Sequence, residues 1–380
     1  MAIAQCVIGA LVLKHAWRRC SRPVFLAVAM GLVVAGAALV VGMLSDFQRC
    51  MMLFAHYLGR PTVEVIHIIA FIWCFSSTPA VLLYFITRWL IRRVPHDHQP
   101  ERRKLIVNAG KAVVAAPFAV IAYGATVGRT DFQVEEVEIP VPNLPADLSR
   151  LRIVQLSDIH LSAFLSEQEL ARVIDMTNEL RPDIALVLGD LISHGGDPID
   201  AALKQCARIR ADRILGVLGN HERYAGVERY TADRGASLGI DFLRSRAEVM
   251  RFGSAELNFG GVDYQAIKDR DRYLKGADAL IRPGAVNVLL SHNPDVFPVA
   301  ARQGWDVTLS GHTHGGQVTV EILSQTLNMA RVYTPYVSGF YRIGRNSCYV
   351  TRGIGTIGIP ARVGVPPEIT SIRLVKGPSA

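Results

Sequence analysis

Three long apolar stretches mark the first third of the chain. They are nearly free of charged residues and cover residues 24–45, 62–87 and 105–127. Each exceeds the roughly 20 residues that cross a bilayer as a helix, and runs of this length do not favour the alternative of buried core helices. Residues 1–13 are apolar but short. The pattern therefore predicts a membrane region over residues 1–130 with three to four transmembrane helices.

The periodicity changes after residue 130. Residues 131–150 alternate valines with acids and then contain three prolines, which predicts an edge strand followed by a linker turn. Beyond them, Ser166 and Glu169 form a capping-box pattern at the start of a helix that Pro182 ends. Short apolar runs with the composition of buried strands cover residues 151–156, 184–188, 214–218, 286–290 and 306–309. This alternation predicts an α/β domain over residues 151–380.

Composition and charge support this division. Half of the residues are hydrophobic and the mean hydropathy is +0.25, which is high for a soluble enzyme. The formal charge of +8 is concentrated in residues 1–130, where 14 Lys and Arg stand against 4 Asp and Glu, while the remaining residues hold 27 and 29. A nucleic-acid-binding protein has a basic face on its working domain. The near-neutral α/β domain therefore argues against a nucleic-acid partner.

Lys and Arg in the short loops predict the orientation of the helices. Four basic residues shortly precede the first apolar stretch and six precede the third, whereas the loop between the first two has only Arg49 and Arg60. By the positive-inside rule the two basic loops are cytoplasmic, so the last helix leads outward. A basic run before the third stretch also resembles a twin-arginine export signal, and that interpretation exports the domain too. We therefore expect a multi-pass protein of a bacterial inner (cell) membrane with a periplasmic, or otherwise extracytoplasmic, α/β domain.

Polar motifs stand at the ends of five of the predicted strands. They are Asp158-Ile159-His160, Gly189-Asp190, Gly219-Asn220-His221-Glu222, Ser291-His292 and Gly311-His312-Thr313-His314. The carboxyl ends of strands in α/β sheets line the crevice where ligands bind, so we expect these side chains to meet at one place. They offer oxygen and imidazole ligands and no thiolate, a set that suits two closely spaced divalent cations. Such a pair of ions is used to hydrolyse phosphate esters.

This ordered set of motifs resembles the calcineurin-like metallophosphoesterase family. The family signature is Asp-x-His, Gly-Asp, Gly-Asn-His-Asp/Glu, a single His and Gly-His-x-His, and the resemblance covers roughly residues 150–375. It is closest to an exported or membrane-associated bacterial branch, whose members often carry a tail similar to residues 341–344, 352–355 and 366–369. The resemblance implies an α/β fold, a four-layer αββα sandwich, here preceded by an all-α transmembrane region.

The resemblance also implies a role for each polar side chain. Seven residues would hold two divalent metal ions, namely Asp158, His160 and His314 for the first, Asn220, His292 and His312 for the second, and Asp190 as a bridge. His221 would not be a ligand but would face the substrate phosphate as a general acid or hydrogen-bond donor. A hydroxide bridging the metals would attack phosphorus. Neutral imidazoles suit Mn, Fe or Zn better than Mg.

One position departs from the family pattern. Many members have a second Asp three residues after the bridging one, where this chain has Ser193 followed by His194. We expect that acid to lie outside the ligand set, so the change affects the tuning of the site rather than its existence, and Asp197 is a candidate substitute. Glu222 either orients His221 or caps the following helix, and the sequence favours neither.

The expected function is that of a membrane-anchored metallophosphoesterase, a hydrolase of phosphoric ester bonds, with a phosphodiester or a lipid-linked phosphate as substrate. Some relatives cleave the pyrophosphate of a lipid-linked nucleotide sugar at the cytoplasmic face, so that reaction is expected only if the topology is reversed. A non-catalytic metal or ligand sensor is the second hypothesis. Retention of His221 argues against it, because a pure binding module does not need this histidine.

Overall fold

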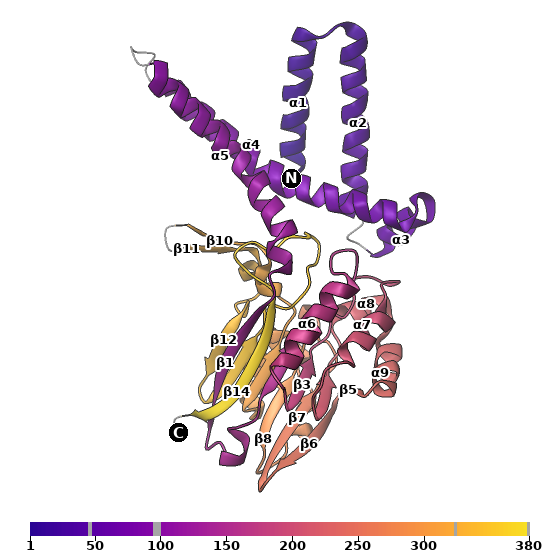
Figure 1. The fold of residues 1–380 in the computed structure, drawn as a ribbon, viewed down its shortest axis with the longest axis vertical. Coiled ribbons are helices and arrows are strands. Elements are labelled where there is room, and N and C mark those ends of the chain that lie inside the picture. The colour runs from indigo at the N-terminus through magenta and orange to yellow at the C-terminus, as the bar shows by residue number, and fades with distance from the viewer. Residues whose placement is uncertain (45–47, 94–99, 323–324, 378–380) are drawn as a thin grey trace. The chain divides into compact units, whose positions relative to one another are not determined.

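The computed structural model describes residues 1–44, 48–93, 100–322 and 325–377 (Figure 1). The chain divides into two compact units. One is formed by Met1–Val127 together with Gly358–Ala361, and the other contains Gly128–Ile357 and Arg362–Ala380. The described secondary structure of the first unit consists of helices, and the second unit contains the sheets.

The helical unit consists of five described helices, α1 (Ala2–Arg19), α2 (Arg22–Leu44), α3 (Gln48–Leu58), α4 (Arg60–Arg93) and α5 (Pro100–Thr126). Polar contacts fix α1 and α2 against α4. The Gln5 side chain donates to Ser77 Oγ at 2.9 Å and accepts from the Trp73 indole at 2.8 Å. His67 Nδ1 donates to the carbonyl of Gly42 at 2.9 Å. Polar side chains thus pair between helices that otherwise present apolar surfaces.

Three of the described helices are long and apolar enough to cross a membrane. They cover Arg22–Leu44, Pro61–Arg93 and Pro100–Thr130. These ranges contain the three apolar stretches found in the sequence, except for residue 45, which lies outside the described residues. The apolar start of the chain belongs to α1, which does not meet the same criterion among the described helices.

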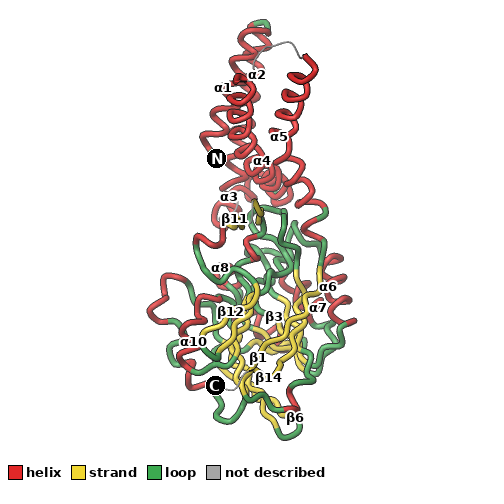
Figure 2. Tube along the Cα trace, turned by 90° about the vertical axis from the view of Figure 1, so that its left-hand side faces the viewer, coloured by secondary structure: helices red, strands yellow, loops and turns green. Residues whose placement is uncertain are grey.

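Two six-stranded sheets form the centre of the second unit (Figures 1 and 2). The first has the order β1 (Gln133–Pro142), β14 (Glu368–Gly377), β2 (Ile153–Leu156), β3 (Ile184–Val187), β4 (Arg213–Gly216), β5 (Ile240–Phe242). The second has the order β12 (Gly339–Ile343), β13 (Asn346–Val350), β9 (Val307–Ser310), β8 (Val286–Leu290), β7 (Ala255–Gly261), β6 (Arg246–Phe252). A separate ribbon pairs β10 (Thr319–Ile322) with β11 (Gln325–Asn328).

Helices cover the outer face of each sheet. An apolar layer between the sheets includes Leu186 and Leu215 from the first and Phe259 and Val288 from the second. The first sheet packs on its other face against α6 (Glu167–Glu179), α7 (Ile199–Cys206) and α9 (Glu228–Ser237). The second packs against α10 (Phe297–Gln303) and the segment around residues 273–277. The layers therefore follow the predicted αββα order, and the two sheets are each mixed in strand direction.

The five predicted strands and the predicted helix are present as β2, β3, β4, β8, β9 and α6. Ser166 Oγ accepts from the Glu169 N–H at 3.2 Å and the Glu169 carboxylate accepts from the Ser166 N–H at 2.7 Å, which confirms the capping box. The strand expected within 131–150 is longer than predicted, because β1 continues through Pro140 and Pro142. It tolerates them as an edge strand, since its only neighbour is β14 and one row of its N–H groups needs no partner.

Candidate metal centre

The predicted site residues all follow strands, as the sequence indicated. Asp158 and His160 follow β2, Asp190 follows β3, Asn220 and His221 follow β4, His292 follows β8, and His312 and His314 follow β9. β2, β3 and β4 belong to the first sheet, whereas β8 and β9 belong to the second. The candidate site is therefore assembled by both sheets at the carboxyl ends of their parallel strands.

Asp158, His160 and His314 form one group of potential ligands, with ligand atoms within 4.8 Å of one another. His314 Nε2 lies 3.3 Å from Asp158 Oδ1 and 3.1 Å from His160 Nε2. All three side chains are buried. Two ring nitrogens at this separation either share one proton or bind one cation, and the nearby carboxylate favours a positive charge between them.

Asp190, His292 and His312 form a second group within the same limit of 4.8 Å. Asp190 Oδ2 lies 3.0 Å from His292 Nε2 and 3.6 Å from His160 Nε2, so one carboxylate oxygen faces both groups. Its other oxygen accepts the backbone N–H of His221 at 2.9 Å. Asp190 thus lies where a bridging ligand would be needed, which is the role the resemblance implies for it.

Unpaired buried atoms test whether a metal fits this second group. Asn220 Oδ1, His292 Nε2 and His312 Nδ1 are buried, and none has a hydrogen-bond partner of acceptable geometry in the described part of the chain. A buried polar atom without a partner costs on the order of 1–3 kcal/mol. The three residues are the ones that the resemblance assigns to the second ion together with Asp190. A divalent cation would satisfy imidazole nitrogen and amide oxygen alike, so the donor set fits a metal.

Burial controls the charge of the histidines. It lowers the pKa of His312 to about 4 and that of His314 to about 3, and it holds the pKa of His160 well below its ordinary value. These rings are neutral at pH 7 and have a lone pair for a metal. Burial would also lower the pKa of His292, but the neighbouring Asp190 carboxylate outweighs it and raises that pKa to about 10. A cation bound there would displace this proton.

Backbone conformation is unusual at the ligands. Ten described non-glycine residues have a positive φ, and five of them are candidate ligands: Asp158 (52°), His160 (50°), Asp190 (53°), His312 (74°) and His314 (52°). Each such residue costs on the order of 1–3 kcal/mol and persists only where its surroundings determine it. Residues of this kind cluster at functional sites, so the backbone points to the same place as the side chains.

Two motif glycines are explained by close packing at the ligands. A Cβ on Gly219 would overlap Asp190 Oδ1, and a Cβ on Gly311 would overlap Ser157 Oγ and Asp158 Oδ2. Any side chain at either position would push a candidate carboxylate ligand away. The glycines that open the Gly-Asn-His and Gly-His motifs therefore make room for the metal ligands rather than for a turn.

Ser193, the position that departs from the family pattern, contacts two histidines of the site. Its Oγ lies 3.1 Å from His160 Nδ1, and its carbonyl accepts from His221 Nδ1 at 2.6 Å. Asp197 Oδ2 in turn accepts the backbone N–H groups of Ser193 at 2.9 Å and of His194 at 2.6 Å. Asp197 therefore holds the turn from which Ser193 orients the two histidines.

Glu222 lies beneath the same loops and is fully buried. Its carboxylate accepts three backbone N–H groups, from Gly219 at 2.8 Å, Asp190 at 2.9 Å and Leu191 at 2.7 Å. The first bond caps α8 (Asn220–Ala225), so helix capping is observed. Among the described residues, the hydrogen bonds of the Glu222 carboxylate go to these backbone groups. Its further effect is to hold the Asp190 loop against the start of α8.

His221 is only half-buried, and its ring centroid lies 4.8 Å from that of His160. Because the Ser193 carbonyl can only accept, Nδ1 carries a hydrogen, and Nε2 gains one when the ring is charged. The imidazolium can then donate from Nε2, as a general acid must. His221 also lies close enough to His160 and Asp190 to complete a third potential ligand group.

Tyr264 was not predicted from the sequence, and its ring lies beside two histidines of the site. Its ring centroid lies 5.4 Å from that of His312 and 6.1 Å from that of His292. Burial, followed by the nearby Tyr224, raises the pKa of its hydroxyl. Arg223 Nη1 donates to its carbonyl at 3.0 Å and so fixes its loop. Tyr264 follows β7 by three residues, and a prediction of that strand would have placed it beside the other strand-end residues.

Replacement of Ser193 by Ala is expected to weaken metal binding or activity about 10–100-fold, the usual cost of losing a partner that orients a metal-bound histidine. The change removes the Oγ contact to His160 Nδ1 but keeps the carbonyl that binds His221. Metal titration by calorimetry and kcat/KM would measure it. Ser237→Ala is the control, because that hydroxyl bonds only within the exposed end of α9. An unchanged metal affinity and kcat/KM in Ser193→Ala would contradict the orienting role.

Known proteins are similar to this chain in sequence. The model of the family described as "Calcineurin-like phosphoesterase" matches residues 151–316 of this chain. A "Transmembrane protein with metallophosphoesterase domain" from Danio rerio is 33% identical over 281 residues, which cover 69% of this chain and 61% of that protein. The "Uncharacterized metallophosphoesterase Cj0846" from Campylobacter jejuni is 29% identical, with 64% of this chain and 63% of that protein covered.

A further relative has a named activity. The "Phosphodiesterase YaeI" of Escherichia coli is 28% identical over 235 residues, which cover 59% of this chain and 82% of that protein. The chain spans about three fifths of the length of the Danio and Campylobacter proteins. The matched stretch 151–316 contains all eight predicted site residues. By this match and by the αββα sandwich that carries it, the chain belongs to the calcineurin-like phosphoesterase family.

Proposed function

We propose that this chain is a membrane-anchored, metal-dependent phosphohydrolase with a dinuclear centre, and that phosphodiesters are its preferred substrates. One observation carries the proposal: Asp190 faces two groups of buried ligands at once, and unpaired buried atoms remain in the second group. The family and the relative named as a phosphodiesterase support the reaction class. Mn, Fe or Zn fits the imidazole-rich ligand set.

Each residue has a defined task in this proposal. Asp158, His160 and His314 would hold one ion, Asn220, His292 and His312 would hold the other, and Asp190 would be shared by both. When bound, two such ions polarise the phosphoryl group and lower the pKa of water, so that hydroxide is available near neutral pH. His221 supplies a proton to the departing oxygen from Nε2, while the Ser193 carbonyl holds its Nδ1 at 2.6 Å. Ser193 Oγ fixes the ring of His160, and Glu222 holds the Asp190 loop.

Hydrolysis of chromogenic esters by the full-length protein in detergent tests the proposal. The protein would be stripped of metal, then assayed with a phosphodiester and a phosphomonoester after addition of Mn²⁺, Zn²⁺ or Mg²⁺. A ligand at 100 times its Kd adds about 2.7 kcal/mol of stability, so metal binding should raise Tm by roughly 5–10 °C for a domain of this size. Metal-dependent cleavage that favours the diester is expected. A Tm shift without hydrolysis of either ester would support the sensor hypothesis instead.

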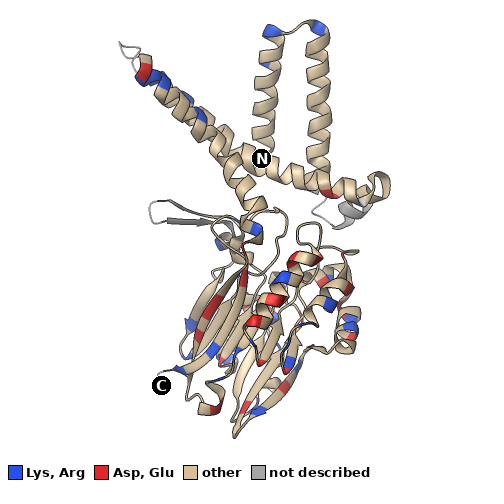
Figure 3. Ribbon diagram, in the orientation of Figure 1, with Lys and Arg blue, Asp and Glu red and all other residues tan. Residues whose placement is uncertain are grey.

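We further propose that α2, α4 and α5 span a membrane and that the metallophosphoesterase domain lies outside the cytoplasm. Figure 3 shows Lys and Arg positions along the ribbon at the turn between α1 and α2 and toward the ends of α4 and α5 that flank residues 94–99. The positive-inside rule favours these two ends as cytoplasmic. Anchoring of the domain to a bilayer favours a lipid-linked phosphoester among the diesters. If the domain is protected from protease added outside intact cells, the topology is reversed and a lipid-linked nucleotide-sugar pyrophosphate becomes the better candidate.

A further inference from the structure

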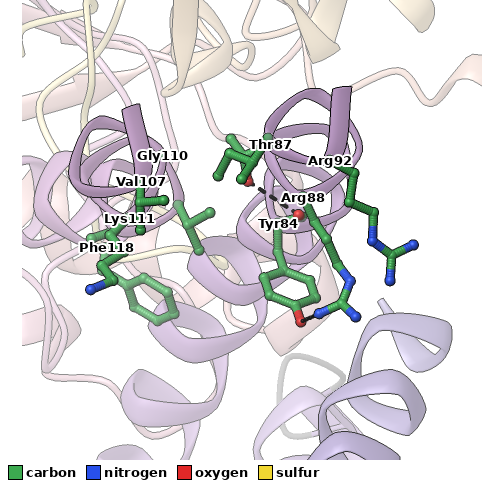
Figure 4. Close-up of a pocket in the computed structure, with 11 residues that line it drawn as sticks. Tyr84, Thr87, Arg88, Arg92, Val107, Gly110, Lys111 and Phe118 are labelled. Carbon is green, nitrogen blue, oxygen red and sulfur yellow. Dashed lines mark hydrogen bonds between the residues drawn. The ribbon is translucent and has the colours of Figure 1, made fainter. Parts of the chain in front are cut away.

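A cleft of about 680 Å³ opens between α4 and α5 within the helical unit (Figure 4). Its volume lies in the range of roughly 300–1,000 Å³ that is usual for small-ligand sites. Most of its wall is apolar, and its basic residues are Arg88 and Arg92 from α4 and Lys111 from α5. We propose that this cleft binds one anionic glycerophospholipid, with the phosphate at the guanidinium groups of Arg88 and Arg92, which lie on the same side of the cleft (Figure 4), and an acyl chain along the apolar wall. This site is separate from the metal centre and goes beyond the proposed hydrolase function.

Charge favours an anion in the cleft. No acidic residue is found among the described residues that line it. Arg88 Nη1 donates to the Tyr84 hydroxyl at 3.0 Å, and neither Arg92 nor Lys111 forms an ion pair with any described residue. Basic side chains next to apolar helix surfaces are costly unless an anion or water compensates them. A lipid phosphate would compensate the two arginines, and basic pockets between membrane helices commonly bind anionic headgroups.

The two ends of the cleft along the helix axes differ in polarity. A Cβ on Gly110 would lie 3.2 Å from Ile91 Cδ1 and 3.6 Å from Thr87 Cβ, so the glycine allows close approach of the helices and sets their register. Lys111 therefore lies level with the turn of α4 that carries the two arginines. Phe118 comes seven residues after Lys111, which is about 10 Å further along α5. The cleft thus has a basic end and an apolar end aligned with the helix axes.

The order of the basic and apolar ends matches the headgroup and acyl chain of a lipid in one leaflet. The basic end points toward the joined ends of α4 and α5, which the charge pattern predicts to be cytoplasmic, and the cytoplasmic leaflet is the anionic one. The apolar end lies deeper along helices long enough to cross a bilayer. Free phosphate would use only the basic end, whereas a phospholipid uses both. The apolar wall therefore favours the lipid.

Native mass spectrometry of the full-length protein in detergent, titrated with phosphatidylglycerol or phosphatidylcholine of the same acyl chains, tests this site. We expect one phosphatidylglycerol to be retained per chain with clear preference over phosphatidylcholine. Each basic side chain near an anionic lipid contributes roughly fivefold, so the double variant Arg88→Gln with Arg92→Gln should lose about 25-fold in affinity. Arg92→Gln alone should lose about fivefold while keeping the Arg88–Tyr84 bond.

The matched control is Arg102→Gln with Arg103→Gln, which removes the same charge from α5 outside the cleft. This variant should retain phosphatidylglycerol within about twofold of the unchanged chain, and Arg88→Lys with Lys111→Arg should bind normally. Equal binding of the two lipids, or an equal loss in the control, would overturn the proposal. Displacement of the lipid by inorganic phosphate at the same concentration would overturn it too, because the acyl chain would then contribute nothing.

Discussion

Asp190→Asn is expected to reduce phosphodiester hydrolysis by more than roughly 100-fold, because losing a direct ligand exceeds the 10–100-fold cost of losing an outer hydrogen-bond partner. Asp190 Oδ2 lies 3.0 Å from His292 Nε2 and 3.6 Å from His160 Nε2, so its charge acts on both ligand groups. Asn has the same shape and still accepts the His221 N–H. It lacks the negative charge that offsets the repulsion between two dications.

The metal content of Asp190→Asn should fall together with kcat/KM. Elemental analysis of the purified protein measures the first, and the chromogenic diester assay measures the second. Asp233→Asn is the matched control, because Asp233 is an exposed acid of α9 that pairs only with Arg229, at 3.6 Å. Two ions per chain and full activity in Asp190→Asn would rule out the bridging role.

His221→Ala is expected to lower kcat by about 10²–10⁴-fold, the usual contribution of a positioned general acid. The physical reason is the loss of the Nε2 proton that neutralises the leaving oxygen. The Asp190 and His160 side chains remain, since neither uses the His221 ring as its hydrogen-bond partner. Metal content should therefore stay at the level of the unchanged chain.

A comparison with His292→Ala separates the two possible roles of His221. His292 Nδ1 donates to the Leu188 carbonyl at 2.6 Å, which leaves Nε2 for a metal. His292→Ala should lose both metal and activity, whereas His221→Ala should lose activity alone. A loss of one ion in His221→Ala would show that it is a ligand, as its proximity to His160 and Asp190 permits.

The parts of the fold with a local pattern could be predicted from the sequence. Apolar runs predicted the strands β2, β3, β4, β8 and β9, and the Ser166–Glu169 pair predicted the start of α6. The family resemblance predicted the layer order and implied a ligand set, whose side chains lie together in the structure. It could do so because strand-end positions converge in any α/β sheet, whatever joins the strands.

Other parts depend on contacts between distant residues. β1 pairs in parallel with β14 at the other end of the domain, and nothing local to residues 133–142 specifies that partner or keeps Pro140 in the strand. The contacts of Ser193 with the two histidines depend on a turn that Asp197 stabilises and on the positions of His160 and His221 in the folded chain. Tyr264 was missed because its strand, β7, alternates less clearly and ends in glycines. Three-dimensional packing therefore decides how the site is tuned.

The assembly of the ligands from both sheets has a consequence for the life of the protein. An ion held by His160 and His314 closes a loop between residues 154 positions apart. In this respect it resembles a disulfide, which restricts the unfolded chain more as the closed loop grows. Unlike a disulfide, it is reversible and depends on metal supply. Scarcity of metal would therefore both abolish the activity of the domain and weaken the connection between its two sheets. Metal-free molecules would then be the first to be degraded by proteases.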